Sequence, residues 1–209
     1  MQSKILGGGG YGLVFGEGEI ATKVLYDKTN PDALVKESTI QQRARQILVA
    51  NNIPIRIPRI LNTRKYLASI AMERIFPPED FEEQIHIALG YKGTDINNVW
   101  YVGDTEVYRG LYANSDLIEA FGADVNDIAY NMGRALRVLL NNGIIPNDVE
   151  FILDKNLEVW MIDFGLAEFG NTDPIQYLNK EGWQGLKTDV YVPHEEMPGY
   201  EKFQSGFRA

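Results

Sequence analysis

Hydrophobic and polar residues follow a short-period pattern in the first part of the chain. Apolar runs at residues 4–6, 13–15 and 20–26 are separated by glycine-rich and acidic segments. Short apolar runs bounded by turn residues are typical of strands in hairpins. We therefore expect three antiparallel strands here. Residues 59–63 and 66–72 predict a further hairpin after Pro58.

The spacing of the apolar residues changes to three or four after Asn30. The resulting stripe consists of Ala33, Glu37, Ile40, Ala44 and Ile47. It predicts one face of a helix, with Asn30 as the N-cap and Pro31 at the first helical position. A carboxylate on a core-facing stripe is costly unless a cation meets it. Two interpretations of Glu37 are open: it pairs with a buried cation, or the stripe is tilted and Glu37 lies at its edge.

A second and stronger helix is predicted over residues 124–142, and Gly143 is placed to end it. Its apolar face consists of Ile128, Met132, Ala135, Leu136 and Leu139. Apolar runs at 151–153 and 159–162 predict two short strands around a turn. An Asp-Phe-Gly sequence follows the second strand directly, at residues 163–165.

The remaining segments lack a clear period. Residues 76–123 are rich in Gly, Asn, Asp and Tyr, and we expect them to be irregular. The last forty or so residues contain Pro174, Pro193 and Pro198 and are expected to form mainly turns. The predicted first sheet ends near Ile75, so we divide the chain into domains 1–75 and 76–209.

Composition excludes several kinds of function. The 209 residues include 20 Lys and Arg against 29 Asp and Glu, a net charge of −9, which argues against nucleic-acid binding. The chain has no cysteine, which removes disulfides, cysteine-bound zinc, iron–sulfur clusters and thiol nucleophiles. Its only histidines are His86 and His194, far apart in sequence, so a histidine-rich metal site is not expected. No membrane-spanning run and no signal peptide are recognised, so we expect a cytoplasmic protein, or one exported by another route.

A glycine-rich segment between the first two predicted strands is the first candidate for chemistry. It reads Gly7-Gly8-Gly9-Gly10-Tyr11-Gly12, followed by Leu13 and Val14. Such a loop can fold closely over a triphosphate and offer backbone N–H groups to its oxygens. Any glycine-rich hairpin tip matches the same pattern. Because a strand follows the loop, a dinucleotide-binding turn, which needs a helix next, is disfavoured.

Two charged residues on predicted strands are the next candidates. Lys23, on the third strand, can neutralise the α- and β-phosphates of a nucleotide, with Glu37 holding its ammonium group in place. It can equally be a solvated strand residue. Asp163 stands at a strand end, where it can hold Mg²⁺ against phosphates or simply form a turn.

Taken together and in this order, these features resemble the protein kinase superfamily. The shared order is a glycine-rich loop, a strand lysine, a helix glutamate, a hairpin, a long helix and Asp-Phe-Gly, over about residues 1–170. The resemblance implies an α+β, minimal two-lobed fold with ATP and Mg²⁺ or Mn²⁺ in the cleft. Residues 1–75 would be an antiparallel sheet with one helix, and residues 76–209 a truncated, mostly helical lobe.

The catalytic loop departs from the family pattern. No His-Arg-Asp occurs before Asp163, and the ungapped position of the catalytic aspartate falls on Ile145. Glu150, 13 residues before Asp163, stands where the family has its metal-binding asparagine. If the loop is shortened, Asp148 is the carboxylate that can orient the acceptor hydroxyl. The resemblance then implies that Asp163 and Glu150 hold the metal.

In size and layout the chain is similar to Hop-type effector kinases of plant-associated bacteria, which phosphorylate the eukaryotic ninety-kilodalton heat-shock chaperone. This likeness implies a monomeric serine/threonine protein kinase, delivered into a host cell by type III secretion and acting on a host protein in virulence. It implies neither a nucleic-acid nor a membrane partner. Three alternatives stay open: a pseudokinase that serves as a binding module, a small-molecule phosphotransferase, and transfer of AMP instead of phosphate.

Overall fold

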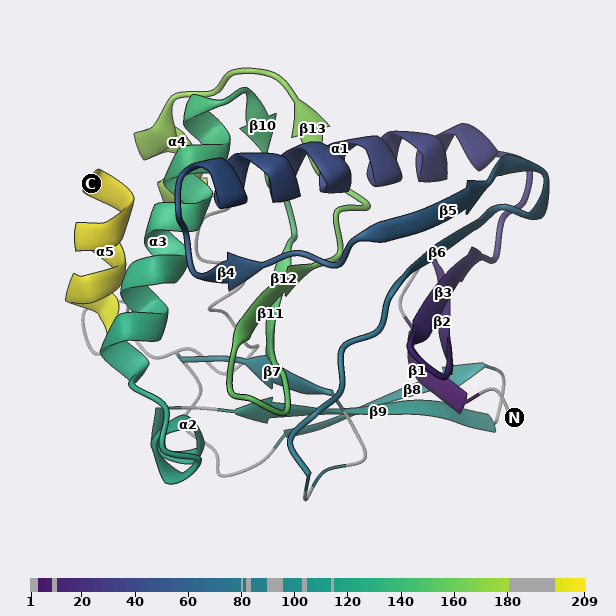
Figure 1. Cartoon of the computed structure of the whole chain (residues 1–209), viewed down its shortest axis with the longest axis horizontal. Coiled ribbons are helices and arrows are strands. Elements are labelled where there is room, and N and C mark those ends of the chain that lie inside the picture. Colours follow the sequence, from purple (N-terminus) through teal and green to yellow (C-terminus); the bar gives the residue numbers. More distant parts are fainter. Residues whose placement is uncertain are drawn as a thin grey trace.

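A computed structural model describes residues 4–8, 11–79, 81, 84–89, 96–102, 105–113, 115–180 and 198–209, with the backbone alone for 96–102, 105–112 and 179–180. This part of the chain has a mixed α+β fold with two main sheets (Figure 1). The first sheet is antiparallel, in the order β1-β2-β3-β6-β5. Its strands are β1 (Lys4–Gly8), β2 (Gly12–Glu17), β3 (Ile20–Leu25), β5 (Ile60–Arg64) and β6 (Ser69–Glu73). The three predicted N-terminal strands and the later hairpin are thereby confirmed, with the 3₁₀ turn η1 (Lys65–Leu67) inside the hairpin.

Helix α1 (Pro31–Ala50) contacts the hairpin strands β5 and β6 through its buried face. Pro31 occupies the first turn as predicted, but the Asn30 side chain makes no capping hydrogen bond; its backbone carbonyl accepts one from the Ala33 amide instead. The buried face also differs from the predicted stripe at its start, because Ala33 is exposed and Leu34 is buried. Glu37 is only 5% exposed, so the interpretation that places it at the edge of a tilted stripe is wrong.

The second sheet is mixed, in the order β4-β12-β11-β7-β9-β8. Its strands are β4 (Ile55–Arg56), β7 (Ile85–Ile87), β8 (Ile96–Val102), β9 (Thr105–Ala113), β11 (Glu150–Leu153) and β12 (Val159–Ile162). The β4–β12 and β7–β9 pairs are parallel, and the other pairs are antiparallel. The two strands predicted around the turn at Asp154 are confirmed as β11 and β12.

The expectation that residues 76–123 are irregular is wrong. The described part of this segment contains strands β7, β8 and β9 and helix α2 (Ser115–Ala120). The Val, Trp and Tyr residues of this segment favour strands, but Asn and Gly residues, which disfavour strands, stand among them. In addition, β7 pairs with β11, and the sequence near β7 does not indicate this partner.

Helix α3 (Val125–Asn141) matches the predicted helix closely. The Asp124 side chain caps it by accepting hydrogen bonds from the amides of Asn126 and Asp127, and Gly143 follows its end with a positive φ of 74°. The predicted apolar face is buried. The short strands β10 (Ile144–Ile145) and β13 (Glu168–Phe169) pair beyond it.

The end of the chain is more helical than expected. It forms α4 (Pro174–Lys180) and α5 (Tyr200–Arg208), and residues 181–197 between them lie outside the described residues. Helix α5 lies directly against α3 (Figure 1) because glycines allow backbone contact. A Cβ on Gly133 would lie 2.2 Å from the Phe203 carbonyl oxygen, and one on Gly206 would lie 2.0 Å from that of Tyr130. Among the described residues, the largest apolar core lies among α1, α3, α5 and the second sheet.

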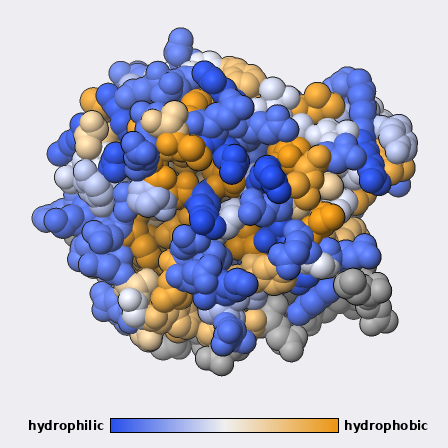
Figure 2. Space-filling view, in the orientation of Figure 1, coloured by the Kyte–Doolittle hydropathy of each residue, from blue (hydrophilic) through white to orange (hydrophobic). Residues whose placement is uncertain are grey.

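Hydrophilic side chains cover much of the surface, with apolar residues visible between them (Figure 2). The largest exposed apolar side chains include those of Tyr66 and Ile175. Among the described residues, no helix combines the length and the apolar character needed to cross a membrane.

Candidate active site

A cavity of about 310 Å³ lies between the first sheet and strands β11 and β12. Nearly all the site residues predicted from the sequence line it: Gly7, Gly8, Tyr11, Gly12, Val14, Lys23, Glu37, Asp148, Glu150 and Asp163. Gly9 and Gly10, the other two predicted residues, lie outside the described residues. Residues from distant parts of the sequence, between Leu6 and Asp163, therefore meet at one concave surface, as is usual for a binding or catalytic site.

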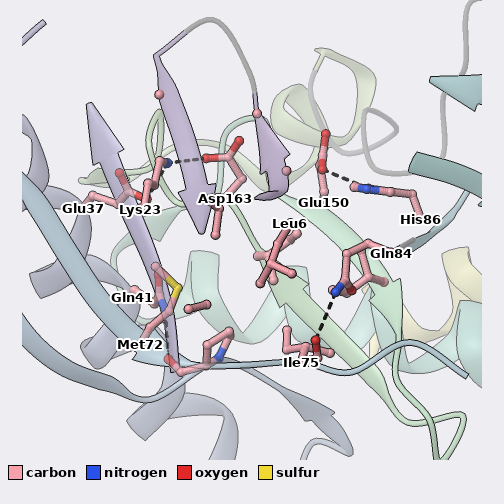
Figure 3. Close-up of a pocket in the computed structure, with 18 of the residues that line it drawn as sticks. Leu6, Lys23, Glu37, Gln41, Met72, Ile75, Gln84, His86, Glu150 and Asp163 are labelled. Carbon is pink, nitrogen blue, oxygen red and sulfur yellow. Dashed lines mark hydrogen bonds and ion pairs between the residues drawn. The ribbon is translucent and has the colours of Figure 1, made fainter. Parts of the chain in front are cut away.

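Lys23 lies between two carboxylates at one wall of this cavity (Figure 3). Its Nζ is 2.8 Å from Glu37 Oε1 and 3.1 Å from Asp163 Oδ1. Strand β3 supplies the lysine, α1 supplies the glutamate, and the end of β12 supplies the aspartate. The side chains of Lys23 and Glu37 are 12% and 6% exposed, whereas that of Asp163 is 49% exposed. The predicted ion pair of Lys23 with Glu37 is present.

Burial and the neighbouring charges act in opposite directions on the charged groups of this cluster. Burial opposes the charge on Lys23, but the nearby carboxylates of Asp163 and Glu37 outweigh it and raise the pKa of Lys23 above its ordinary value. Burial also raises the pKa of Glu37, although the Lys23 ammonium acts in the opposite direction. The lysine is therefore held as a cation beside the cavity, with one carboxylate buried behind it and one open to the cavity.

Two aspartates at the cavity have left-handed backbone conformations. The φ angle is 58° at Asp163 and 55° at Asp148. Such angles are uncommon for residues other than glycine, and they concentrate at functional sites where surrounding structure enforces them. Asp148 lies in the turn between Pro146 and β11, as predicted.

Gly165 lies close behind the charged cluster. A Cβ at this position would be 3.3 Å from Asp163 Oδ1, 3.6 Å from Lys23 Nζ and 3.7 Å from Glu37 Oε2. Each residue of the Asp-Phe-Gly sequence therefore has its own role. The aspartate contacts the ion pair, and Phe164 is fully buried in the core. The glycine has no side chain that would crowd the three charged groups.

The glycine-rich segment begins within a hairpin, as predicted, because Gly7 and Gly8 belong to β1 and pair with Val14 and Leu13 of β2. Gly12 must be glycine for packing reasons, since a Cβ there would lie within van der Waals overlap of the Val24 carbonyl oxygen, at 2.4 Å. The hairpin thus lies close against β3 and brings its backbone to the edge of the cavity.

Strand β11 directs alternate side chains to opposite sides, as the sequence predicts. Glu150 and Ile152 line the cavity, whereas Phe151 is buried in the core at 2% exposure. His86 Nδ1 lies 3.1 Å from Glu150 Oε2 (Figure 3). Burial opposes ionisation of Glu150, but the contact with His86 and the positive charge of Lys23 hold the pKa of this carboxyl below its ordinary value.

His86 is a site residue that the sequence reasoning missed. The distance between the two histidines in the sequence argues against a histidine-rich metal site, but the partner of His86 in the structure is the carboxylate of Glu150. In the sequence, the feature that could have indicated His86 as a site residue is its position as a polar residue between two apolar ones, in Ile85-His86-Ile87. Pairing of His86 with Ile152 across β7 and β11 places it beside Glu150.

The remainder of the cavity is an apolar slot. Its walls include Leu6, Val14, Ala21, Met72, Ile75, Ile152 and Ile162. Gln84 donates a hydrogen bond from Nε2 to the Ile75 carbonyl, 3.0 Å away, and so fixes the segment that leaves the first sheet (Figure 3). Gln41, on α1, donates one from Nε2 to the Pro58 carbonyl at 2.8 Å. Such a lining suits a ligand with an apolar part and with charged groups that face Lys23 and Asp163.

Glu150 and Asp163 are the residues that could hold a divalent metal ion at this cavity. The described residues contain no group of three or more His, Asp and Glu side chains arranged for a metal ion. Two carboxylates suit Mg²⁺, which is typically held by one or two carboxylates together with substrate phosphates and water. The donor set therefore fits a metal that arrives with a phosphorylated ligand.

No model of a known protein family matches this chain, and a search of curated proteins finds no match either. Function is therefore inferred from the geometry of the cavity.

Proposed function

We propose that the chain is an ATP-dependent phosphotransferase, a serine/threonine protein kinase of minimal and atypical type. The observation that carries this proposal is the placement of Lys23 between Glu37 and Asp163 at the wall of a cavity with an apolar slot. The antiparallel sheet with α1 against it supports a small nucleotide-covering lobe. Strands β11 and β12 with α3 support a second, reduced lobe of a kinase-like fold.

The cavity is suited to a nucleoside triphosphate in one orientation. The apolar slot between Val14, Ala21 and Ile152 takes the adenine ring, and the glycine-rich hairpin lies over the phosphates. Lys23 then neutralises the α- and β-phosphates. Glu37, buried behind it, keeps the ammonium group from turning away from the phosphates.

Asp163 and Glu150 would hold Mg²⁺ or Mn²⁺. The metal, when bound, neutralises charge on the phosphate oxygens as the phosphoryl group is transferred. Asp163 is suited to this task because its carboxylate is half exposed toward the cavity while one oxygen is fixed by Lys23. Its left-handed backbone conformation turns it out of the line of β12.

Asp148 is the residue that we assign to the acceptor hydroxyl. It lines the cavity on the turn just before Glu150, within the same short segment as the metal-binding carboxylate. A carboxylate in this place orients the hydroxyl and accepts its proton as the bond from the hydroxyl oxygen to the γ-phosphorus forms and the bond from that phosphorus to the departing ADP breaks. Most of the rate acceleration then comes from positioning and charge neutralisation.

The acceptor that we propose is a serine or threonine of a host protein. The likeness in layout to bacterial effector kinases makes the eukaryotic ninety-kilodalton heat-shock chaperone the first substrate to examine. This part of the proposal rests on the sequence resemblance alone, and the proposed delivery into a host cell rests on it too.

The test is incubation of the pure protein with labelled ATP and Mg²⁺, with either a eukaryotic lysate or the purified chaperone. We expect label from γ-labelled ATP on a protein band and none from α-labelled ATP. Label from α-labelled ATP would instead indicate AMP transfer. Nucleotide binding without transfer to any acceptor would make the chain a pseudokinase and overturn the proposed activity.

A further inference from the structure

The contact between His86 and Glu150 adds a residue to the site that the general kinase pattern does not explain. His86 Nδ1 is 3.1 Å from Glu150 Oε2, and both residues line the cavity. The side chain of His86 is 13% exposed and that of Glu150 is 44% exposed. The imidazole is thus largely enclosed, while the carboxylate it contacts is open to the cavity.

The backbone fixes this contact from both sides. His86 is the middle residue of β7, between Ile85 and Ile87, which are buried in the core. Its strand partner is Ile152, two residues from Glu150 and on the same face of β11. The strand pairing fixes the backbone beneath both side chains, and the 13% exposure of the His86 side chain limits how far its imidazole can turn away from the carboxylate.

A carboxylate has two oxygens, and here they face different surroundings. Oε2 is at ion-pair distance from His86 Nδ1, which leaves the other oxygen for a ligand in the cavity. Metal-binding carboxylates are usually held by a second polar partner, and loss of that partner typically weakens metal binding by about 10- to 100-fold. A glutamate side chain has more rotatable bonds than an asparagine, so it has more need of a support.

We propose that His86 is a positioning residue for Glu150, and that it holds this carboxylate in the orientation that binds a divalent cation beside the nucleotide phosphates. The inference rests on the proposed function, because it requires a metal–nucleotide complex in this cavity.

Three substitutions separate a polar contact at the position of Nδ1 from mere packing. Asparagine can place an amide N–H near the position of Nδ1, glutamine places its amide farther out, and leucine fills the space without a donor. The measurement is the affinity for Mn²⁺ in the presence of ADP, followed by electron paramagnetic resonance of the free ion. ADP binding without metal and the melting temperature are recorded for each variant.

We expect His86→Leu and His86→Gln to weaken Mn²⁺ binding by about tenfold or more, and His86→Asn to stay within about threefold of the wild type. The affinity for ADP without metal should stay unchanged. In a Glu150→Gln background, His86→Leu should cause little further loss, because the two residues act as one unit. If His86→Leu does not fold, the contrast between Asn and Gln still decides the matter.

The outcomes also separate this inference from the proposed function. If the wild type binds no Mn²⁺ with ADP, the proposed metal–nucleotide site is absent and both fail. If the wild type binds Mn²⁺ with ADP and the His86→Leu variant binds Mn²⁺ with the same affinity, the proposed function stands and His86 is only a packing residue. Equal losses in the Asn, Gln and Leu variants would likewise overturn a role for the Nδ1 donor.

Discussion

Lys23 contacts two carboxylates that come from distant parts of the sequence. Removing one partner of a buried ion pair leaves an uncompensated charge, whereas apolar replacement of a whole pair is often neutral or stabilising. A buried lysine–glutamate pair is therefore weak evidence for a stabilising role. Its position at the wall of a cavity, with Asp163 as a second partner, favours a role in binding phosphate.

Gly165 gives a test of how closely this cluster is packed. In Gly165→Ala the new methyl group would lie 3.3 Å from Asp163 Oδ1, so the Asp163 carboxylate must shift by a few tenths of an ångström. We expect phosphate transfer to fall at least about tenfold, because small misplacements of catalytic groups are costly. Gly170→Ala is the matched control, since its methyl group would be equally close, 3.3 Å, to Ile145 Cδ1, away from the cluster. Equal activity in the two variants would show that the spacing behind the cluster does not matter.

Asp148 gives a second test at the same scale. Asp148→Asn removes the proton acceptor but keeps the size of the side chain, so turnover should fall by about two orders of magnitude or more. The affinity for Mg·ATP, measured by calorimetry, should stay nearly unchanged. Asp116→Asn, on the exposed side of α2, should behave like the wild type. Wild-type turnover in Asp148→Asn on a true substrate would remove Asp148 from the mechanism.

Some secondary structure elements can be predicted from the local spacing of apolar residues, and others cannot. The first sheet, α1 and α3 follow regular apolar periods, and all were predicted. The sequence did not predict strands β8 and β9 or helix α5. Their stability depends on partners distant in the sequence, or their residues have mixed preferences for secondary structure. Helix α5 begins after Gly199 and has Gly206 within it, and glycine is a poor helix former, so its contact with α3 must supply much of its stability.

The contact between α3 and α5 can be tested through Gly206. In Gly206→Ala the new methyl group would overlap the Tyr130 carbonyl, so α5 must move away from α3. We expect a loss of about 1–3 kcal/mol in unfolding free energy, measured by denaturant titration, despite the better helix propensity of alanine. Ser205→Ala introduces alanine on the exposed side of the same helix and should not destabilise the protein. A Gly206→Ala variant as stable as the wild type would mean that the two helices are not in backbone contact.

At the scale of the whole molecule, α1 joins the two halves of the site. Leu34 packs into the small core of the first sheet, whereas Ile40 and Leu48 belong to the large core with α3 and the second sheet. Glu37 lies between these two contacts and meets Lys23 from the first sheet. Asp163 meets the same lysine from the end of β12 in the second sheet. The ion-paired cluster therefore connects both sheets at the cavity.

Most of the site was predictable because its residues stand in a recognisable order along the chain. That order predicted the ion pair of Lys23 with Glu37 and placed Asp163 at the same site, but it did not predict the direct contact of Lys23 with Asp163, 140 residues away. It could not predict His86, whose place depends on the pairing of β7 with β11. Nor could it predict Gln84, which reaches the Ile75 carbonyl from a segment without a regular period.

The central claim is that this cavity binds Mg·ATP through Lys23, and calorimetric titration of Mg·ATP tests it most directly. The wild type should bind one equivalent, and Lys23→Ala should bind at least about tenfold more weakly while remaining folded. Lys36→Ala, which removes an exposed lysine from α1, should bind like the wild type. A wild type that binds no nucleotide, or a Lys23→Ala variant that binds as tightly as the wild type, would contradict the claim.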